Sequence, residues 1–196
     1  MHKFAVVVFV LLCGAFAAAQ LEPKAFDLQK SEIYGGFVYE HADISGSQVP
    51  TDTYIDQSSA SLKGFAIDFS HYQFHNLGYT VELARVWTKA IDNEGDGYSR
   101  MSYLAGPTYR LHRYGFFSPS IHVLAGVEHA VFTVPVPANK LSYANTDFAA
   151  AAGGTLDGNL SRHLAIRLAQ VDYLYTHHYG GDQSSFRYSG GIVIHF

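Results

Sequence analysis

The stretch that decides the predicted fold is residues 185–196, SFRYSGGIVIHF. Counted back in twos from the last residue, the first series is Phe196, Ile194, Ile192, Gly190, Tyr188 and Phe186. The positions between them are His195, Val193, Gly191, Ser189 and Arg187. A period of two residues is that of a β-strand, whose successive side chains point to opposite faces. The stretch therefore predicts an amphipathic strand with one apolar face.

The rest of the chain contains seven more segments of alternating character. Composition agrees, because 14 Tyr, 14 Phe and 18 Gly against only 15% charged residues suit strands and turns better than helices. The phase changes within the seventh segment, and a β-bulge between Leu168 and Gln170 accounts for the change. The eight predicted strands are 31–41, 59–70, 77–88, 99–111, 116–131, 146–157, 163–175 and 185–196. The sequence predicts an all-β fold.

The connections between these segments alternate in length. Long, polar connections are expected at 42–58, 89–98, 132–145 and 176–184. Short ones are expected at 71–76, 112–115 and 158–162. In an up-and-down meander every second connection lies at the same end, so one rim receives three short turns and the other four long loops. Outer-membrane barrels have this asymmetry, with short periplasmic turns and longer external loops.

The faces of the strands indicate which side meets lipid. One face of each strand is apolar, and the other combines small residues with a few charges. A solvent-facing wall normally has many more charges, so we predict a closed, eight-stranded antiparallel transmembrane barrel with its apolar face outward. A soluble, lipocalin-like barrel is the structural alternative. Aromatic girdles are expected from Trp87, Tyr103, Tyr109, Tyr173, Tyr175, Tyr188 and Phe196.

Charged residues on the inward face predict a network in the lumen. Unpaired charges are costly at low dielectric, so these residues are expected to pair and to fill the narrow interior. Conductance would then be small or gated at most. The predicted network consists of Asp68, Glu82, Arg110, Glu128, Arg167 and Arg187.

The first 30 residues predict export. His2 and Lys3 precede an apolar run at 4–12, and Ala17-Ala18-Ala19 offers a cleavage site, so residues 1–19 are expected to be a signal peptide. Residues 20–30 form a polar leader, and 31–196 form the barrel domain. The single cysteine lies in the signal, which excludes thiol chemistry from the mature chain. A modest negative charge without a basic block makes nucleic acid an unfavourable partner.

Two resemblances add to this interpretation. Tyr188, Ile192, Ile194 and Phe196 resemble the C-terminal assembly signal of outer membrane proteins, which implies periplasmic chaperones and the barrel-assembly machinery as partners during biogenesis. A second set of motifs consists of YGGFVY at 34–39, LAGPTY at 104–109, LAGV at 124–127, GGTLD at 153–157 and AIRLAQVDY at 165–173. In their order and spacing these motifs resemble the OmpA-like outer membrane β-barrel domain family, which implies the bacterial outer membrane and its lipid as surroundings. No peptidoglycan-binding domain is expected after the barrel.

Two groups of residues suggest chemistry. His177-His178 lies in one expected external loop and His41 lies near the start of another, but no carboxylate spacing supports a metal site, so no metal and no cofactor are predicted. Ser70-His71 resembles part of a catalytic pair of a lipid-modifying enzyme. It falls at the expected periplasmic rim, however, so no enzymatic activity is predicted.

The resulting prediction is a non-enzymatic barrel that supports envelope integrity or contacts an external ligand or surface partner through its long loops. A small porin or small-ligand carrier is the alternative. A lipid-modifying enzyme ranks below both.

Overall fold

The computed structural model describes residues 29–43, 59–74, 76–88, 97–136, 139–178 and 181–196. The predicted signal peptide and all but the last two residues of the predicted leader lie outside these ranges. No helix in the described part is long and apolar enough to span a membrane.

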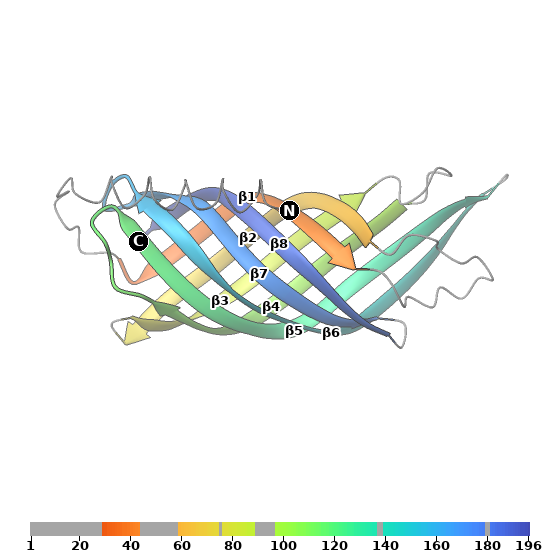
Figure 1. The fold of residues 1–196 in the computed structure, drawn as a ribbon, viewed down its shortest axis with the longest axis horizontal. Coiled ribbons are helices and arrows are strands. Elements are labelled where there is room, and N and C mark those ends of the chain that lie inside the picture. The colour runs from red at the N-terminus through yellow and green to blue at the C-terminus, as the bar shows by residue number, and fades with distance from the viewer. Residues whose placement is uncertain (1–28, 44–58, 75, 89–96, 137–138, 179–180) are drawn as a thin grey trace, which may run out of the picture.

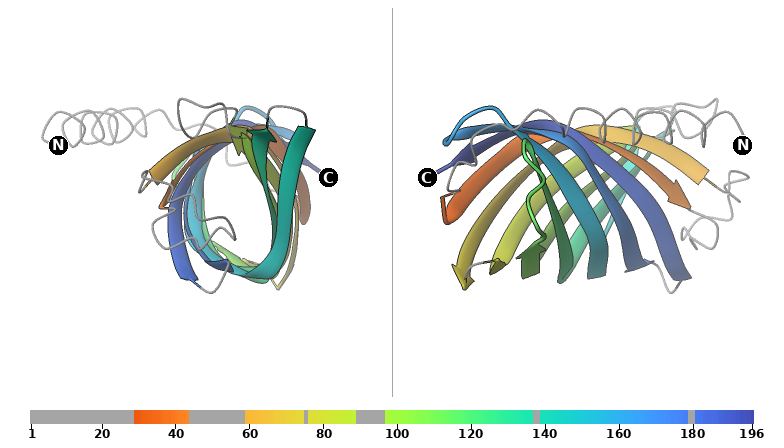
Figure 2. Two further views of the ribbon diagram at one scale, coloured as in Figure 1. Left: turned by 90° about the vertical axis from the view of Figure 1, so that its right-hand side faces the viewer. Right: turned by 60° about the vertical axis from the view of Figure 1, so that its left-hand side comes forward.

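The described residues form one closed sheet (Figure 1). Each strand pairs antiparallel with the next, and the last strand pairs with the first. A view along the barrel shows the strands surrounding one interior (Figure 2, left). The prediction of an all-β, eight-stranded, up-and-down barrel is confirmed. The strands are β1 (Ser31–Asp43), β2 (Ser59–Phe74), β3 (Leu77–Thr88), β4 (Gly97–Arg110), β5 (Phe117–Val136), β6 (Asn139–Asn159), β7 (Leu164–His178) and β8 (Gly181–His195).

The ends of the barrel domain meet at the rim with short turns. The backbone N–H of Ser31 donates to the carbonyl of Phe196 at 3.1 Å, and the N–H of Phe196 donates to the carbonyl of Ser31 at 2.9 Å. The same rim contains the turns 111–116 and 160–163. In the first of these, Gly115 has a φ of 57°, a left-handed conformation that glycine adopts without strain.

Two of the predicted external loops are wrong. Most of 132–145 belongs to β5 and β6, and most of 176–184 belongs to β7 and β8. The segment 132–145 contains Pro135, a residue that the interior of a sheet excludes. Pro135 pairs with Lys140 of β6, and β4 pairs with β5 only as far as Thr133. Among the described residues, Pro135 therefore lies in a part of β5 that has no β4 neighbour, the edge position at which a strand tolerates proline.

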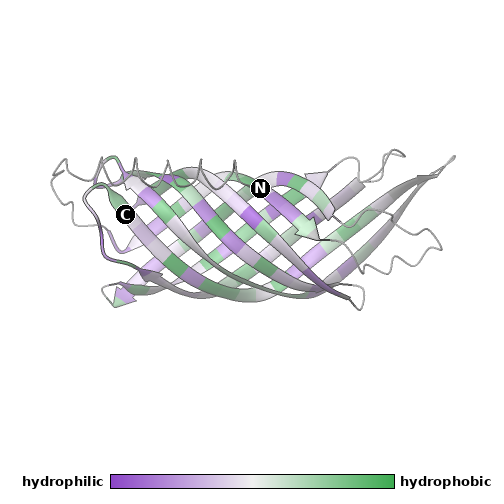
Figure 3. Cartoon of the chain, viewed as in Figure 1, coloured by the Kyte–Doolittle hydropathy of each residue, from purple (hydrophilic) through white to green (hydrophobic). Residues whose placement is uncertain are grey.

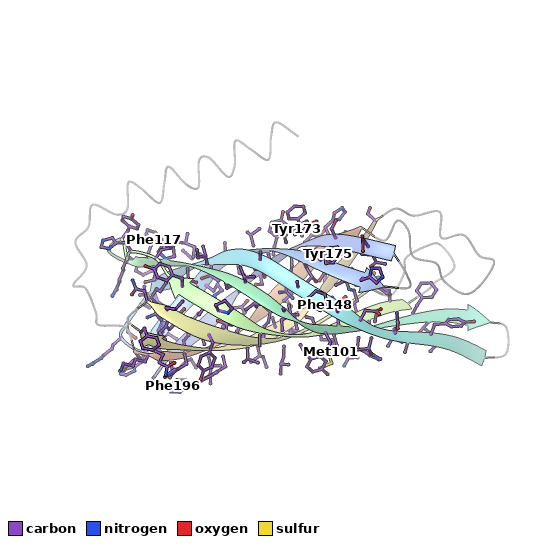
Figure 4. All side chains as sticks on the ribbon, turned by 90° about the horizontal axis from the view of Figure 1, so that it is seen from below. Met101, Phe117, Phe148, Tyr173, Tyr175 and Phe196 are labelled. Atoms are coloured by element: carbon purple, nitrogen blue, oxygen red, sulfur yellow. The ribbon has the colours of Figure 1, made fainter. Side chains whose placement is uncertain are left out.

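The period-two alternation produces a barrel with apolar residues on its outer wall and charged residues in its lumen. Ile67, Val123 and Ile192 are each more than half exposed on the outer wall, whereas Asp68 is buried in the lumen. Figure 3 shows hydrophobic and hydrophilic residues alternating along the strands. The prediction of an apolar outer face is confirmed. All seven predicted girdle aromatics are exposed on this face, and Tyr173 and Phe196 point away from the wall in Figure 4.

The predicted bulge in the seventh strand is present. The register between β7 and β8 breaks between Arg167 and Gln170. Leu168 and Ala169 are consecutive and both exposed, whereas the residues on either side of them are buried. One extra residue on β7 thus reconciles the two halves of the strand and places both Arg167 and Gln170 in the lumen.

Candidate functional site

Arg187 of β8 ties together four strands across the middle of the lumen. Its Nη2 lies 2.5 Å from Glu82 Oε1 of β3 and 3.2 Å from Asp172 Oδ2 of β7. Its Nη1 donates to Ser102 Oγ of β4 at 3.4 Å. These side chains are all buried. A Cβ added at Gly153 would lie 2.0 Å from Asp172 Oδ1, so glycine there leaves room for the carboxylate.

Arg167 of β7 forms a second cluster toward the short-turn end. Its Nε lies 2.9 Å from Asp157 Oδ1, and its Nη1 lies 3.0 Å from Asp68 Oδ2. Gln170 connects this cluster with the first, because its Oε1 accepts from Arg167 at 2.8 Å and its Nε2 donates to Asp172 Oδ2 at 2.8 Å. The bulge therefore determines the positions of both Arg167 and Gln170.

Arg110 extends the network to the short-turn rim. Its Nη2 donates to Glu32 Oε2 at 2.9 Å, and its guanidinium carbon lies 3.7 Å from the centre of the Tyr72 ring. The Tyr72 hydroxyl donates to Glu32 Oε1 at 3.2 Å. Arg167 Nη2 approaches Glu32 Oε1 at 3.9 Å, so Glu32 connects the two arginines.

Arg100 of β4 holds a third cluster toward the external end, and sequence reasoning missed it. Its Nη1 lies 2.7 Å from Glu40 Oε1 of β1, and it also pairs with Glu128 of β5. Its Nη2 donates to Thr176 Oγ1 of β7 at 3.4 Å. The alternation contained the necessary signal, since Arg100 has the same inward phase as Ser102.

The structure joins the six predicted lumen residues only in part. It pairs Arg187 with Glu82 and Arg167 with Asp68, but it pairs Arg110 and Glu128 with residues that were not among the six. Prediction also omitted His122, whose Nε2 lies 2.8 Å from Asp172 Oδ1, and His195, whose Nδ1 lies 3.4 Å from Glu32. The predicted network therefore contained too few carboxylates.

Carboxylates outnumber arginines in the described lumen. Four buried arginines face seven buried carboxylates, and the two histidines are the other basic groups there. Ion pairs between opposite strands cross the interior at three levels. The carboxylates are Glu32, Glu40, Asp68, Glu82, Glu128, Asp157 and Asp172.

Ser70 and His71 lie on opposite sides of the barrel wall. Ser70 is buried in the lumen, where its Oγ lies 2.8 Å from Thr80 Oγ1. His71 belongs to the end of β2 rather than to a turn, and its ring Nδ1 lies 2.9 Å from Ser31 Oγ. Consecutive strand residues point to opposite sides of the wall, so His71 cannot activate Ser70.

The candidate histidines also do not assemble a metal site within the described residues, in which no three metal-ligating side chains cluster. His177 Nδ1 lies 2.8 Å from Asp182 Oδ1, which the Tyr175 hydroxyl also contacts at 2.5 Å. These hydrogen bonds, that of Tyr175 first, lower the pKa of the exposed Asp182 carboxyl. The group links the external ends of β7 and β8.

The hairpin of β5 and β6 projects beyond the other strands at the external end (Figure 1). These strands contain 20 and 21 residues, whereas the other six contain 12 to 16. Pairing between β6 and β7 ends at Ala149 and Thr176, whereas β6 pairs with β5 as far as Asn139. Residues 139–148 of β6 therefore have one paired edge and, among the described residues, one unpaired edge.

Polar side chains stabilise the projecting hairpin across its two strands. His129 Nδ1 lies 2.7 Å from Thr146 Oγ1, and Thr133 Oγ1 lies 3.3 Å from Ser142 Oγ. At its base, the Phe132 ring packs in the interior against Tyr98, with ring centroids 6.4 Å apart. The hairpin is thus held in register well beyond the rim.

Comparison with known proteins finds the fold in solved structures. The attachment invasion locus protein Ail of Yersinia pestis aligns over 87% of this chain and 100% of its own, with a TM-score of 0.65 and 17% identity. Neisserial surface protein A aligns over 85% of this chain and 97% of its own, with a TM-score of 0.62 and 12% identity.

The fold is that of a small outer membrane β-barrel. The resemblance to OmpA-like barrels agrees with it at the level of architecture. No family model and no curated protein matches the sequence. The four residues of the predicted assembly signal, Tyr188, Ile192, Ile194 and Phe196, are exposed on the outer wall. Their recognition by the assembly machinery stays a prediction.

Proposed function

We propose that this protein is a non-enzymatic barrel of the bacterial outer membrane that binds a surface partner through the projecting β5–β6 hairpin. The unpaired edge of residues 139–148 carries the proposal. An extended peptide can add to such an edge through main-chain hydrogen bonds, a common mode of recognition. Chaperones and the barrel-assembly machinery act on the chain during biogenesis, after export by a cleaved signal peptide.

The lumen supports a scaffold role for the rest of the molecule. Ion pairs join opposite strands at three levels of the interior and hold the wall in one shape. A rigid barrel contributes to envelope integrity and presents the hairpin at a fixed height above the membrane. This arrangement argues against a porin, because solute would have to displace buried, paired charges.

A shortened hairpin tests the binding role. The pair His129 and Thr146 sits directly opposite across the hairpin, so residues 130–145 can be replaced by Asn-Gly, which favours a two-residue turn and removes most of the unpaired edge. Cells displaying the wild-type barrel should attach to protein-coated surfaces several times better than cells displaying the shortened variant. Heat-dependent gel migration would show that both barrels are folded and equally abundant.

A matched control changes the opposite rim. Replacing residues 160–163 at the short-turn end with another four-residue turn alters the periplasmic side and should leave attachment unchanged. Equal attachment by the wild type and the shortened variant would contradict binding through the hairpin. Loss of attachment in the rim control would show that the hairpin is not the specific determinant.

A further inference from the structure

A groove lies on the outer wall where β7, β8 and β1 are neighbours. Its origin is local, because the bulge turns Ala169 as well as Leu168 outward, and Gly190 on the adjoining strand places no side chain over the wall. The groove has a volume of about 480 Å³ and is open along one side. Its walls include Phe37, Tyr39, Lys63, Leu168, Val171 and Tyr188.

The groove is apolar over most of its length and has a charge at one end. Its volume falls within the range of about 300 to 1,000 Å³ typical of ligand pockets. Tyr39 is opposite Tyr188 on one side and Lys63 on the other, and Lys63 is only four residues from the external end of β2. The cationic end is therefore the external end, and the apolar part extends toward the middle of the wall.

A second cation lies beside the first on the same wall. Lys63 is opposite Trp87 and Phe65 is opposite Arg85, so Lys63 and Arg85 are diagonal neighbours across β2 and β3. Both are exposed, and neither forms an ion pair with a described carboxylate. An exposed cation on a lipid-facing wall is costly unless an anion or the membrane surface compensates its charge.

We propose that this groove binds a membrane lipid with a phosphorylated, anionic headgroup. An acyl chain lies along the apolar groove, and Lys63 and Arg85 contact the phosphate. Lysine and arginine are the ordinary protein partners of phosphate, and charge-assisted contacts of this kind are strong. The inference requires the membrane location proposed above but does not depend on the hairpin.

The direction of the groove favours a lipid over a protein segment. A lipid in the external leaflet has its charge toward the surface and its chains toward the bilayer centre, the same order as the charged and apolar parts of the groove. A transmembrane partner helix would instead need an extended apolar contact and would gain nothing from the two cations. Charge complementarity at one end therefore identifies the occupant.

Lipid retention by the purified full-length barrel tests the site. The probe is lipid A bearing two phosphates, compared with monophosphoryl lipid A of the same acyl composition, and native mass spectrometry counts the lipid that remains bound. The wild type should prefer the bisphosphorylated form. The double variant K63Q/R85Q should lose roughly tenfold in retention, as expected when charge-assisted contacts are removed.

Three further variants separate the headgroup contact from the acyl-chain contact. Ala169→Phe fills the groove without touching either cation and should also reduce retention, whereas Ala105→Phe, an exposed position on β4, should not. Arg162→Gln removes an exposed cation at the opposite rim and serves as the charge control. Heat-dependent gel migration checks that every variant is folded.

Four results would overturn the proposal. Retention independent of phosphate number, or unchanged in K63Q/R85Q, would exclude the cations as a headgroup site. Unchanged retention in Ala169→Phe would exclude the groove as the site of the chain. Inorganic phosphate that binds to the two cations without reducing lipid retention would show that the cations bind a free anion rather than this lipid. None of these results depends on whether the hairpin binds a partner.

Discussion

The two faces of the same wall use opposite rules. Inside, charged side chains from distant strands are buried and paired, as Arg187 is with Glu82 and Asp172. Outside, aliphatic and aromatic side chains are exposed, and the cations Lys63 and Arg85 have no described carboxylate partner. The difference shows that the surroundings determine whether a charged residue stabilises the barrel. A charge stabilises the inner face only through its partner, and it destabilises the outer face wherever lipid surrounds it.

The largest expected effect comes from breaking a pair inside. Arg187→Met leaves Glu82 and Asp172 facing each other in the lumen, and removing one member of a buried pair costs about 3 to 5 kcal/mol. Urea unfolding in lipid vesicles would measure the loss. Adding Glu82→Gln should restore part of the stability, since His122 and Gln170 still contact Asp172. A single variant as stable as the wild type would show that the pairing contributes little.

A charge placed on the outer face should cost somewhat less. Ile67 lies in the middle of β2 and is 58% exposed on the wall. Ile67→Arg should destabilise the barrel by about 2 to 4 kcal/mol in vesicles, as arginine does near the bilayer midplane of outer membrane barrels. Ile67→Ala is the control for lost apolar surface. An arginine variant no less stable than the alanine variant would contradict the assignment of this face to lipid.

A neutral hydrogen bond inside should matter less than either charge. Ser120 Oγ and Thr155 Oγ1 lie 2.6 Å apart in the lumen. Ser120→Ala should reduce the free energy of unfolding by about 1 kcal/mol, the usual net value of such a bond. The same urea experiment measures it, and a loss as large as that of Arg187→Met would remove the distinction between charged and neutral pairs.

The smallest effect is expected at the exposed external rim. The hydrogen bonds from Tyr175 and His177 hold the pKa of Asp182 below its ordinary value of 3.8. Because the folded pKa is the lower one, the stabilisation is present above that ordinary value and disappears as the pH falls through the folded pKa. An NMR titration should show the Asp182 midpoint rising in Tyr175→Phe but not in Tyr173→Phe. An unchanged midpoint would mean that the hydroxyl does not hold the carboxylate.

Sequence alternation was sufficient for most of the architecture. Residues 185–196 predicted both the strand and its faces because lipid outside and charge inside leave no ambiguity of phase. Even the bulge in β7 was predictable, since Leu168 and Gln170 cannot otherwise point to opposite sides. The external hairpin was not predictable, because neither face of a strand must be apolar above the membrane. Pro135 is compatible with the edge of a sheet, so it does not exclude a strand.

The lumen network was harder to predict than the wall. Alternation places Arg100 and Glu40 inward, but it does not say which residues on distant strands reach the same level. That depends on the register of all eight pairings and on the tilt of the strands. Glu128 and Arg110 were therefore recognised as inward charges, while their partners were not.

The hydrogen bonds between Ser31 and Phe196 have a kinetic consequence. Seven of the eight strand pairings join neighbours in the chain, whereas the pairing of β1 with β8 joins its two ends. Closing so large a loop carries the greatest entropic cost of any pairing in the molecule. The seam between β1 and β8 should therefore form last, so until that step the nascent sheet has two open edges, and completion of the cylinder is a single late event.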